Sequence, residues 1–425
     1  MLKKLLVLLS SLVIYFSLAS CNMASAAGAG DTEKTLVVWG FNDELESLIN
    51  DYYKKDFSNI KIDYSLVLSN VIENKLDQAF SSGSGAPDVF ALEESFVRKY
   101  VEQGDNYLLD LTDVYDKIKT KMIDYPAKIG TCNGKVYALS WTVSPGAFIY
   151  RRSLAKQYFG TDDPDQVQAY FENVDKFLDA ANLLKTKSNN KCCVISSYEE
   201  LYKPYLGLRE NPWIVNGQLK VDPVMEKYMD MCKTLRDSGL EARAEQWSGD
   251  WFNGMKDALE EKKVFGYFFP EWGLQYVLKP NAIGTEGDWA VIKGPSAWHN
   301  GEIWIAAYKG TKNPKQAKEM IEYLCSNDSF LEKLVNDNKT LVVNKNVVNK
   351  MQDNAMFSDS FLGGQNYYKA YIGFANDVNG SIRQSNDVKI EEIFMNSVKS
   401  YVNGEATKET ALNNFKQEVN QALGL

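Results

Sequence analysis

Histidine is almost absent from this 425-residue chain, and cysteine is scarce. The sequence contains one histidine, His299, and six cysteines. A single imidazole excludes most histidine-based metal sites and leaves one candidate base for a nucleophilic triad. The cysteines lack paired Cys-x-x-Cys spacing, which argues against a zinc site, and no phosphate-binding loop of the G-x-x-x-x-G-K type is present. We therefore expect neither a metal nor a cofactor.

Positive charge is also in short supply. Lysine and arginine total 47 against 56 aspartates and glutamates, which gives a formal net charge of −9. An acidic chain without a long basic run is a poor binder of nucleic acid, so no nucleic-acid partner is expected. Hydrophobic residues make up 45% of the chain, an ordinary globular balance, and its length favours two lobes. We expect a monomer.

The apolar run nearest a membrane-spanning length lies at the N-terminus. Lys3 and Lys4 precede a nearly unbroken apolar run over residues 5–18, and small residues follow it. This order is typical of a signal peptide, here residues 1–20, and the run is too short for a comfortable membrane span. The cysteine that comes next resembles the lipobox cysteine of bacterial lipoproteins. That resemblance implies a lipid on Cys21; an ordinary secretory signal with a chance cysteine is the alternative.

A short unpatterned segment follows the leader. Residues 21–33 are mostly small and polar, which predicts a flexible, lipidated tether. We therefore expect the protein on the extracellular face of a bacterial cell membrane, held there through the lipid on Cys21. The acidic body would sit clear of the anionic surface.

Strand and helix patterns alternate beyond the tether. Residues 35–39 form a β-prone run, and apolar residues between 45 and 53 recur at the spacing of one helical face. Residues 60–64 alternate as in a strand, residues 71–80 give a second helical face, and residues 89–92 give a third strand. The order β-α-β-α-β predicts an α/β fold with a parallel sheet and right-handed crossovers.

Polar and aromatic side chains lie at the ends of two of these strands. Trp39, Asn42 and Asp43 end or follow the first strand, and Glu93 follows the third. Ligands of an open parallel sheet bind beyond the carboxyl ends of its strands, so these residues should face one crevice. An aromatic ring, an amide and carboxylates suit a neutral polyol. The alternatives stay open: Asn42 or Asp43 could only cap the next helix, and Glu93 could be a solvated turn residue.

Nine tryptophans are the second signal, and several stand beside turn residues. Examples are Trp141 after Leu-Ser, Trp272 in a Pro-Glu-Trp-Gly segment, and Trp298 after Pro-Ser-Ala. The C–H face of a pyranose packs on a flat aromatic ring, and tryptophan offers the largest surface. Carboxylates at the rim, such as Glu271, would accept hydrogen bonds from sugar hydroxyls. For any single tryptophan, core packing is the alternative.

Six short segments form an ordered set along the chain. They are residues 85–89 (GAPDV), 134–141 (GKVYALSW), 146–151 (GAFIYR), 251–259 (WFNGMKDAL), 269–272 (FPEW) and 309–314 (KGTKNP). Together with the leader and the first strand-helix unit, they resemble the extracellular solute-binding lipoproteins of ABC sugar importers, in the maltodextrin-binding-like group of family 1. The resemblance spans nearly the whole chain.

The resemblance implies a two-lobed, periplasmic-binding-protein-like fold of type II, with several hinge crossovers. Each lobe would hold a mostly parallel sheet flanked by helices. Lobe 1 would comprise residues 34–143 and 296–338, and lobe 2 residues 144–295 and 339–425. A sugar or oligosaccharide would bind in the interlobe cleft, and closure would present it to the permease subunits of an ABC transporter.

Pattern and resemblance together select a set of ligand-binding candidates. In chain order these are Trp39, Asn42, Asp43, Glu93, Trp141, Glu271, Trp272, Trp298 and Trp304. By the resemblance, Trp141 lies where the hinge meets the cleft, while Trp298 and Trp304 fall in a hinge-flanking loop and strand that sometimes supply a stacking ring.

Two other functions stay open. Carboxylates near aromatic rings, such as Glu93 and Glu271, are compatible with a glycoside hydrolase, which needs two carboxyl groups roughly 5–10 Å apart. A glycan-binding adhesin or sensor on the same scaffold would bind without transport. We expect binding without catalysis.

Overall fold

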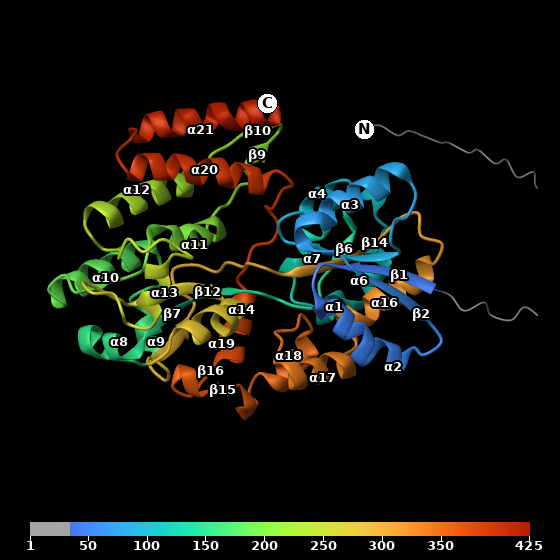
Figure 1. Ribbon diagram of the computed structural model, residues 1–425, viewed down its shortest axis with the longest axis horizontal. Coiled ribbons are helices and arrows are strands. Elements are labelled where there is room, and N and C mark those ends of the chain that lie inside the picture. Colours follow the sequence, from blue (N-terminus) through green and yellow to red (C-terminus); the bar gives the residue numbers. More distant parts are fainter. Residues whose placement is uncertain (1–34) are drawn as a thin grey trace, which may run out of the picture.

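The computed structural model describes residues 35–425, so the predicted signal peptide, Cys21 and the tether lie outside the described residues. Two lobes stand side by side and are joined by extended segments (Figure 1). No helix in the described range is long and apolar enough to cross a membrane. The two-lobed α/β architecture agrees with the fold that the sequence predicts.

Lobe 1 is built on a five-stranded sheet in the order β2-β1-β3-β14-β6. Its strands are β1 (Thr35–Gly40), β2 (Lys61–Leu66), β3 (Val89–Glu93), β6 (Ala138–Leu139) and β14 (Ile303–Ala307). β1 pairs in parallel with β2 and β3, as predicted, whereas β14 runs antiparallel to β3 and β6. β3 and β14 are buried almost throughout, and this burial explains their continuous apolar sequences.

Helices lie above and below this sheet in the view of Figure 1. They are α1 (Asp43–Leu48), a π-helical turn (Ile49–Tyr53), α2 (Lys54–Asp56), α3 (Ser69–Ser82), α4 (Val97–Glu102), α5 (Gly104–Tyr107), α6 (Thr112–Ile118), α7 (Tyr125–Ile129), α16 (Pro314–Ser326) and α17 (Asp328–Asn338). The predicted helical face near residues 45–53 is buried, because Leu45, Leu48 and Ile49 pack into the core.

Lobe 2 contains a three-stranded sheet in the order β12-β7-β13. The strands are β7 (Gly146–Arg151), β12 (Gly266–Pro270) and β13 (Trp289–Ile292), and the short strand β8 (Cys192–Cys193) pairs in parallel with β11 (Lys263–Val264). β7 runs antiparallel to both of its neighbours. Neither main sheet is therefore mostly parallel throughout, which differs from the prediction: that of lobe 1 is mixed, and that of lobe 2 is antiparallel. The reason is that β7 leads away from the hinge, while β13 leads back toward it.

The helices of lobe 2 pack around this sheet and extend to the C-terminus. They are α8 (Arg152–Phe159), α9 (Pro164–Gln168), α10 (Val174–Lys187), α11 (Tyr202–Gly207), α12 (Pro223–Asp237), α13 (Gly249–Met255), α14 (Glu271–Gly273), a π-helical turn (Leu274–Leu278), α15 (Lys279–Asn281), α19 (Tyr367–Ala375), α20 (Asp387–Val402) and α21 (Lys408–Leu423). A core of buried apolar side chains includes residues of α10, α12, α20 and α21.

Three crossovers join the lobes: the first lies between β6 and β7, the second between β13 and β14, and the third follows α17. They hydrogen-bond to one another. The Val143 N–H donates to the Leu341 carbonyl at 2.9 Å, which joins the first and third crossovers. The Gly146 N–H donates to the Trp298 carbonyl at 2.7 Å, which joins the first and second. These short paired segments form the hinge, because they are the covalent path from one sheet to the other.

The predicted division into lobes at residues 143, 295 and 338 stays a prediction. One helix on the far side of the last boundary, α18 (Lys345–Met351), packs on α17 of lobe 1. The segment between α19 and α20 also touches lobe 1, where the Ser385 N–H donates to Glu102 at 2.9 Å. The lobes therefore share contacts beyond the crossovers themselves.

Candidate ligand-binding site

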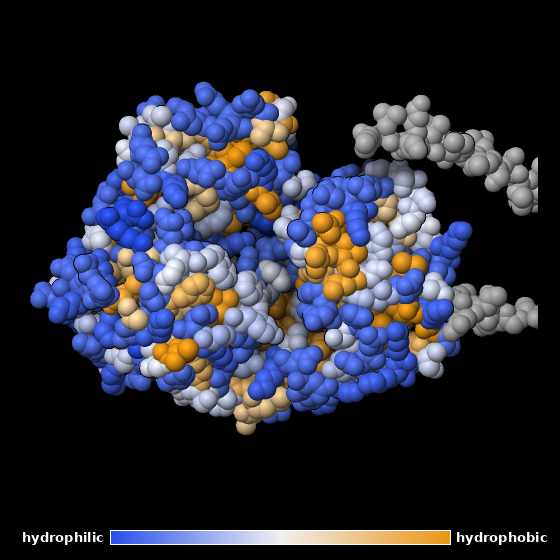
Figure 2. All heavy atoms as spheres, viewed as in Figure 1, coloured by the Kyte–Doolittle hydropathy of each residue, from blue (hydrophilic) through white to orange (hydrophobic). Residues whose placement is uncertain are grey.

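A cavity of about 740 Å³ lies between the lobes. The first turn of α1 forms the wall from lobe 1, α14 and the π-helical turn after it form the wall from lobe 2, and the crossovers close the remaining sides. The polar and aromatic lining residues are Asn42, Asp43, Glu44, Thr142, Ser144, Glu271, Trp272, Gln275, Tyr276, Asn338, Lys339, Thr340 and Tyr367. In space-filling view the surface is hollowed between the lobes (Figure 2).

A second cavity of about 450 Å³ adjoins the first. Both are lined by Asn42, Gly301 and Ile303, so they are neighbouring parts of one cleft. Glu93 lines this second part, at the end of β3, as its position in the sequence predicted. Its carboxylate accepts hydrogen bonds from the hydroxyls of Ser69 and, at 3.3 Å, Ser95.

The turn after β1 caps a helix and also lines the cleft. Asn42 is the N-cap of α1, and its side-chain oxygen accepts from the Glu44 N–H at 3.3 Å. The same residue lines both parts of the cleft. Asp43 is exposed in the first helical turn and lines the larger cavity, so the helix start brings several polar groups to one wall.

Glu44 is a cavity residue that the sequence analysis missed. Its Oε1 accepts a hydrogen bond of 3.1 Å from Nε1 of Trp141, whose side chain is completely buried. Burial raises the pKa of Glu44, the Trp141 hydrogen bond opposes that rise, and the nearby Asp43 adds to it. Trp141 therefore lies behind the cavity wall and contacts a lining residue instead of facing the cavity.

Trp272 lies where the two parts of the cleft meet. Its half-buried ring lines the larger cavity, and its Nε1 donates to the Asn300 carbonyl at 2.9 Å. A Cβ atom at Gly301 would lie 2.6 Å from that nitrogen, and Gly301 adopts a φ of +93°, so glycine lets the indole approach the crossover closely. The predicted position of Trp272 in the cleft thus agrees with the geometry.

Two further groups of lobe 2 face the cavity beside Trp272. Burial raises the pKa of Glu271 to about 7, while Gln275 and Lys279 work to lower it. Tyr276 is 77% exposed, and its pKa is raised by burial and by the charges of Glu271 and Glu44. Tyr276 therefore lies within electrostatic range of carboxylates from both lobes. It was missed, although its place four residues after Trp272 on a helical segment is a usable signal.

Besides Trp141, three predicted tryptophans do not line either part of this cleft. Trp304 is completely buried, and its Nε1 donates to the Pro126 carbonyl at 2.9 Å. Trp298 is 4% exposed and fills the space beside Gly146, where an added Cβ would lie 2.0 Å from its ring. Trp39 is partly buried on β1. We leave all three out of the contact set, because core packing occupies their faces.

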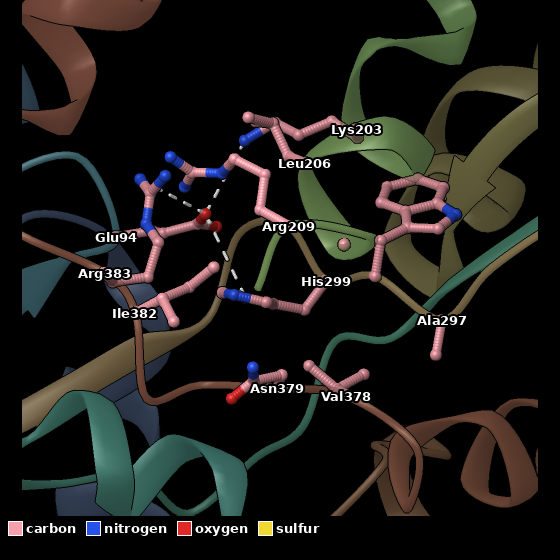
Figure 3. A pocket seen from close by; sticks show the side chains of 12 residues that line it. Glu94, Lys203, Leu206, Arg209, Ala297, His299, Val378, Asn379, Ile382 and Arg383 are labelled. Carbon is pink, nitrogen blue, oxygen red and sulfur yellow. Dashed lines mark ion pairs between the residues drawn. The ribbon is translucent and has the colours of Figure 1, made fainter. Parts of the chain in front are cut away.

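A charged cluster joins the lobes beside the smaller part of the cleft (Figure 3). Glu94 of lobe 1 lies 3.6 Å from Lys203, 4.0 Å from Arg383 and 4.0 Å from His299. Burial by itself would raise the pKa of Glu94, but these three groups hold it below its usual range. His299 also lies 2.8 Å from Glu302, so the sole histidine belongs to an ion-pair network.

Glu94, His299 and Glu302 present possible metal ligands within 4.8 Å of one another. Both carboxylates already have hydrogen-bond partners, since the Gly301 N–H donates to Glu94 at 2.5 Å and the Tyr125 hydroxyl donates to Glu302. Two cationic side chains also stand beside the group and would repel a metal ion. The cluster is better described as a network that connects the hinge to both lobes.

Comparisons with known proteins agree with this architecture. A family model described as bacterial extracellular solute-binding protein matches residues 49–358. The arabinooligosaccharide-binding protein of Bacillus subtilis (strain 168) is 26% identical over 171 residues, and the match spans 39% of this chain and 38% of that relative.

Solved structures share the fold over most of the chain. A crystal structure of an extracellular solute-binding protein family 1 member matches with a TM-score of 0.81 at 19% identity, over 92% of this chain and 99% of the other. The ABC transporter associated binding protein from B. animalis subsp. lactis Bl-04, in complex with β-1,6-galactobiose, matches with a TM-score of 0.65 at 22% identity, over 92% and 98%.

Proposed function

We propose that this chain, which belongs to the bacterial extracellular solute-binding proteins, captures a sugar or oligosaccharide between its lobes and delivers it to the permease of an ABC transporter. The names of an arabinooligosaccharide-binding relative and of a galactobiose complex support a carbohydrate ligand. The family consists of binding proteins, so the proposal involves no chemical change of the ligand.

One observation carries the choice of ligand: aromatic rings and carboxylates line the same interlobe cavity. Trp272 and Tyr276 offer ring surface from lobe 2, and Asp43, Glu44 and Glu271 offer acceptors from both lobes. Sugars combine an apolar C–H face with a rim of hydroxyl donors, so this mixture matches their surface. A ligand touched by both walls would favour the closed state, because those contacts exist together only when the lobes meet.

The two carboxylates named as a possible glycoside hydrolase pair line different parts of the cleft. Glu93 lines the smaller part of the cleft and accepts from two serine hydroxyls, whereas Glu271 lines the larger part. We therefore assign acceptor roles to these groups and propose Asn42, Asp43, Glu93, Glu271 and Trp272 as contacts, with Glu44 and Tyr276 added.

The site and the N-terminal pattern together suggest a tethered receptor. We propose that residues 1–20 are removed, that Cys21 carries the lipid, and that residues 21–33 tether a monomeric body to the outer face of the cell membrane. The pattern of basic, apolar and small residues before the cysteine supports this part of the proposal.

Calorimetric titration tests the function directly. Protein lacking residues 1–20 is titrated with arabinooligosaccharides, β-1,6-galactobiose and a panel of other neutral glycans, and the ligand is recovered and weighed by mass spectrometry. We expect saturable binding of at least one glycan, recovered intact. Absence of binding across the panel, or recovery of cleaved product, would contradict the proposal.

A further inference from the structure

We propose that Trp141 is a positioning residue that holds the Glu44 carboxylate at the cavity wall, so that Glu44 accepts a hydrogen bond from a hydroxyl group of the ligand. The inference rests on the proposed function and narrows its ligand class. It selects a neutral glycan that presents a hydroxyl donor to lobe 1, and it disfavours glycans that carry carboxylates.

One oxygen of the Glu44 carboxylate is held by Trp141, and the other has no hydrogen bond within the described residues. Trp141 Nε1 donates to Oε1 of Glu44 at 3.1 Å, and within the described residues this is the single hydrogen bond to that carboxylate. A carboxylate can accept about four hydrogen bonds, so most of its capacity stays unused. Glu44 is half-buried and lines the cavity of about 740 Å³, which places the unused capacity within reach of a ligand.

Both partners of this hydrogen bond are immobilised by backbone structure. The Trp141 carbonyl accepts from the Val343 N–H at 3.0 Å, so the residue is held between two crossovers of the hinge. Glu44 stands in the first turn of α1, whose N-cap is Asn42. The carboxylate is therefore fixed relative to the hinge, and a fixed acceptor binds a ligand with less loss of side-chain entropy.

A buried indole does not need a carboxylate as its acceptor. Trp304 is equally buried, and its Nε1 donates to the neutral carbonyl of Pro126 at 2.9 Å. Backbone carbonyls are thus sufficient for this purpose in the same lobe. At Trp141 the acceptor is the Glu44 carboxylate on the cavity wall. Removing part of a carboxylate from water costs free energy, and a hydrogen bond from a ligand hydroxyl would offset this cost.

The charges around the cavity agree with a neutral ligand. Its lining contains the acidic residues Asp43, Glu44 and Glu271 and one basic residue, Lys339. Glu44 and Glu271 come from opposite lobes, and both influence the pKa of Tyr276. A uronic acid would bring a like charge toward these groups, whereas hydroxyl donors would be attracted to them.

The test is a double-mutant cycle on protein lacking residues 1–20. Wild type, Glu44→Gln, Trp141→Phe and the double variant are titrated with β-1,6-galactobiose, with arabinooligosaccharides and with digalacturonic acid as the acidic comparison. We expect Glu44→Gln to weaken neutral-glycan binding about tenfold. Trp141→Phe should weaken it several-fold, and the double variant should be no weaker than Glu44→Gln alone, because both changes remove the same function.

The matched control is Trp304→Phe, which removes another buried indole N–H and should lower the melting temperature without changing the Kd. A second readout is the pH dependence of Kd. The Trp141 hydrogen bond lowers the pKa of Glu44, so Trp141→Phe should move the binding midpoint to higher pH, and Trp304→Phe should not. If Trp141→Phe fails to fold, Glu44→Gln still tests the acceptor role, since Glu44 is only half-buried.

The outcomes separate this inference from the proposed function. If wild type binds a glycan, three results would overturn the inference alone. They are an unchanged Kd in Glu44→Gln, additive effects in the double-mutant cycle, and equally tight binding of digalacturonic acid. Failure of wild type to bind any glycan in the panel would overturn the proposed function and the inference with it.

Discussion

Replacing Trp272 with alanine tests whether the ring in the cleft contributes to binding. The indole lines the larger cavity, is half-buried and rests against Gly301 of a crossover. Its removal deletes the largest flat surface on the lobe 2 wall and one hydrogen bond to the Asn300 carbonyl. The first loss acts on the ligand and the second on the hinge, so the two effects can be measured separately.

The magnitudes differ in a way that distinguishes them. Loss of a stacked ring should cost at least about 1 kcal/mol of binding free energy, which is about a fivefold rise in Kd. Loss of one partly exposed hydrogen bond should cost about 1 kcal/mol of unfolding free energy, a shift of roughly 2 °C in a chain of this size. We therefore expect a clear change in affinity with a small change in melting temperature.

Titration calorimetry and thermal denaturation of Trp272→Ala and Trp272→Phe provide the assay. Phenylalanine keeps an aromatic face but lacks the indole N–H, so Trp272→Phe should retain most of the affinity and show a similar small loss of stability. An unchanged Kd in Trp272→Ala would refute the reasoning and identify the ring as a hinge support.

Three more predictions concern charge and packing. Burial raises the pKa of Glu200 to about 7, so its protonated form stabilises the fold fully below about pH 4.5, and this contribution is lost as pH rises through 7. Glu200→Gln should therefore reduce the fall of the unfolding free energy between about pH 4 and pH 8, measured by denaturant titration. An unchanged pH dependence would contradict this prediction. Glu271, also with a pKa of about 7, should bind neutral glycans more tightly as pH rises through that value, and Glu271→Gln should reduce the dependence seen by calorimetry at pH 5.5 and 8.5. Gly146→Ala should destabilise the fold by about 1–3 kcal/mol, because its Cβ would lie 2.0 Å from the Trp298 ring; a wild-type melting temperature would show that the ring can move.

The first strands and helices could be predicted because their signals are local. The run before Gly40 and the apolar face that includes Leu45 and Leu48 depend on residues a few positions apart. The helical face is buried, and the strand is buried at alternate residues. The direction of β7 was not predicted. Its sequence is as apolar as that of a parallel strand, and only the hinge path makes it antiparallel to β13.

The candidate site could be predicted in part. Asn42, Asp43, Glu93, Glu271 and Trp272 all line the cleft, since each lies at the end of a strand or in the turn that follows. The tryptophans could not be sorted into ligand-facing and core residues, because the local sequence does not record which side chains pack on each ring.

The amino-acid sequence by itself determined the α/β class and the places where strands end in polar turns, since these follow from periodicity, and its short ordered segments carried the resemblance to the family. Only the tertiary structure decided which of those turns share a cavity and which rings stay in the core. Glu44 and Trp141 are 97 residues apart in sequence and meet through a 3.1 Å hydrogen bond. Contacts of that range depend on how the crossovers bring two sheets together, and no local pattern records them.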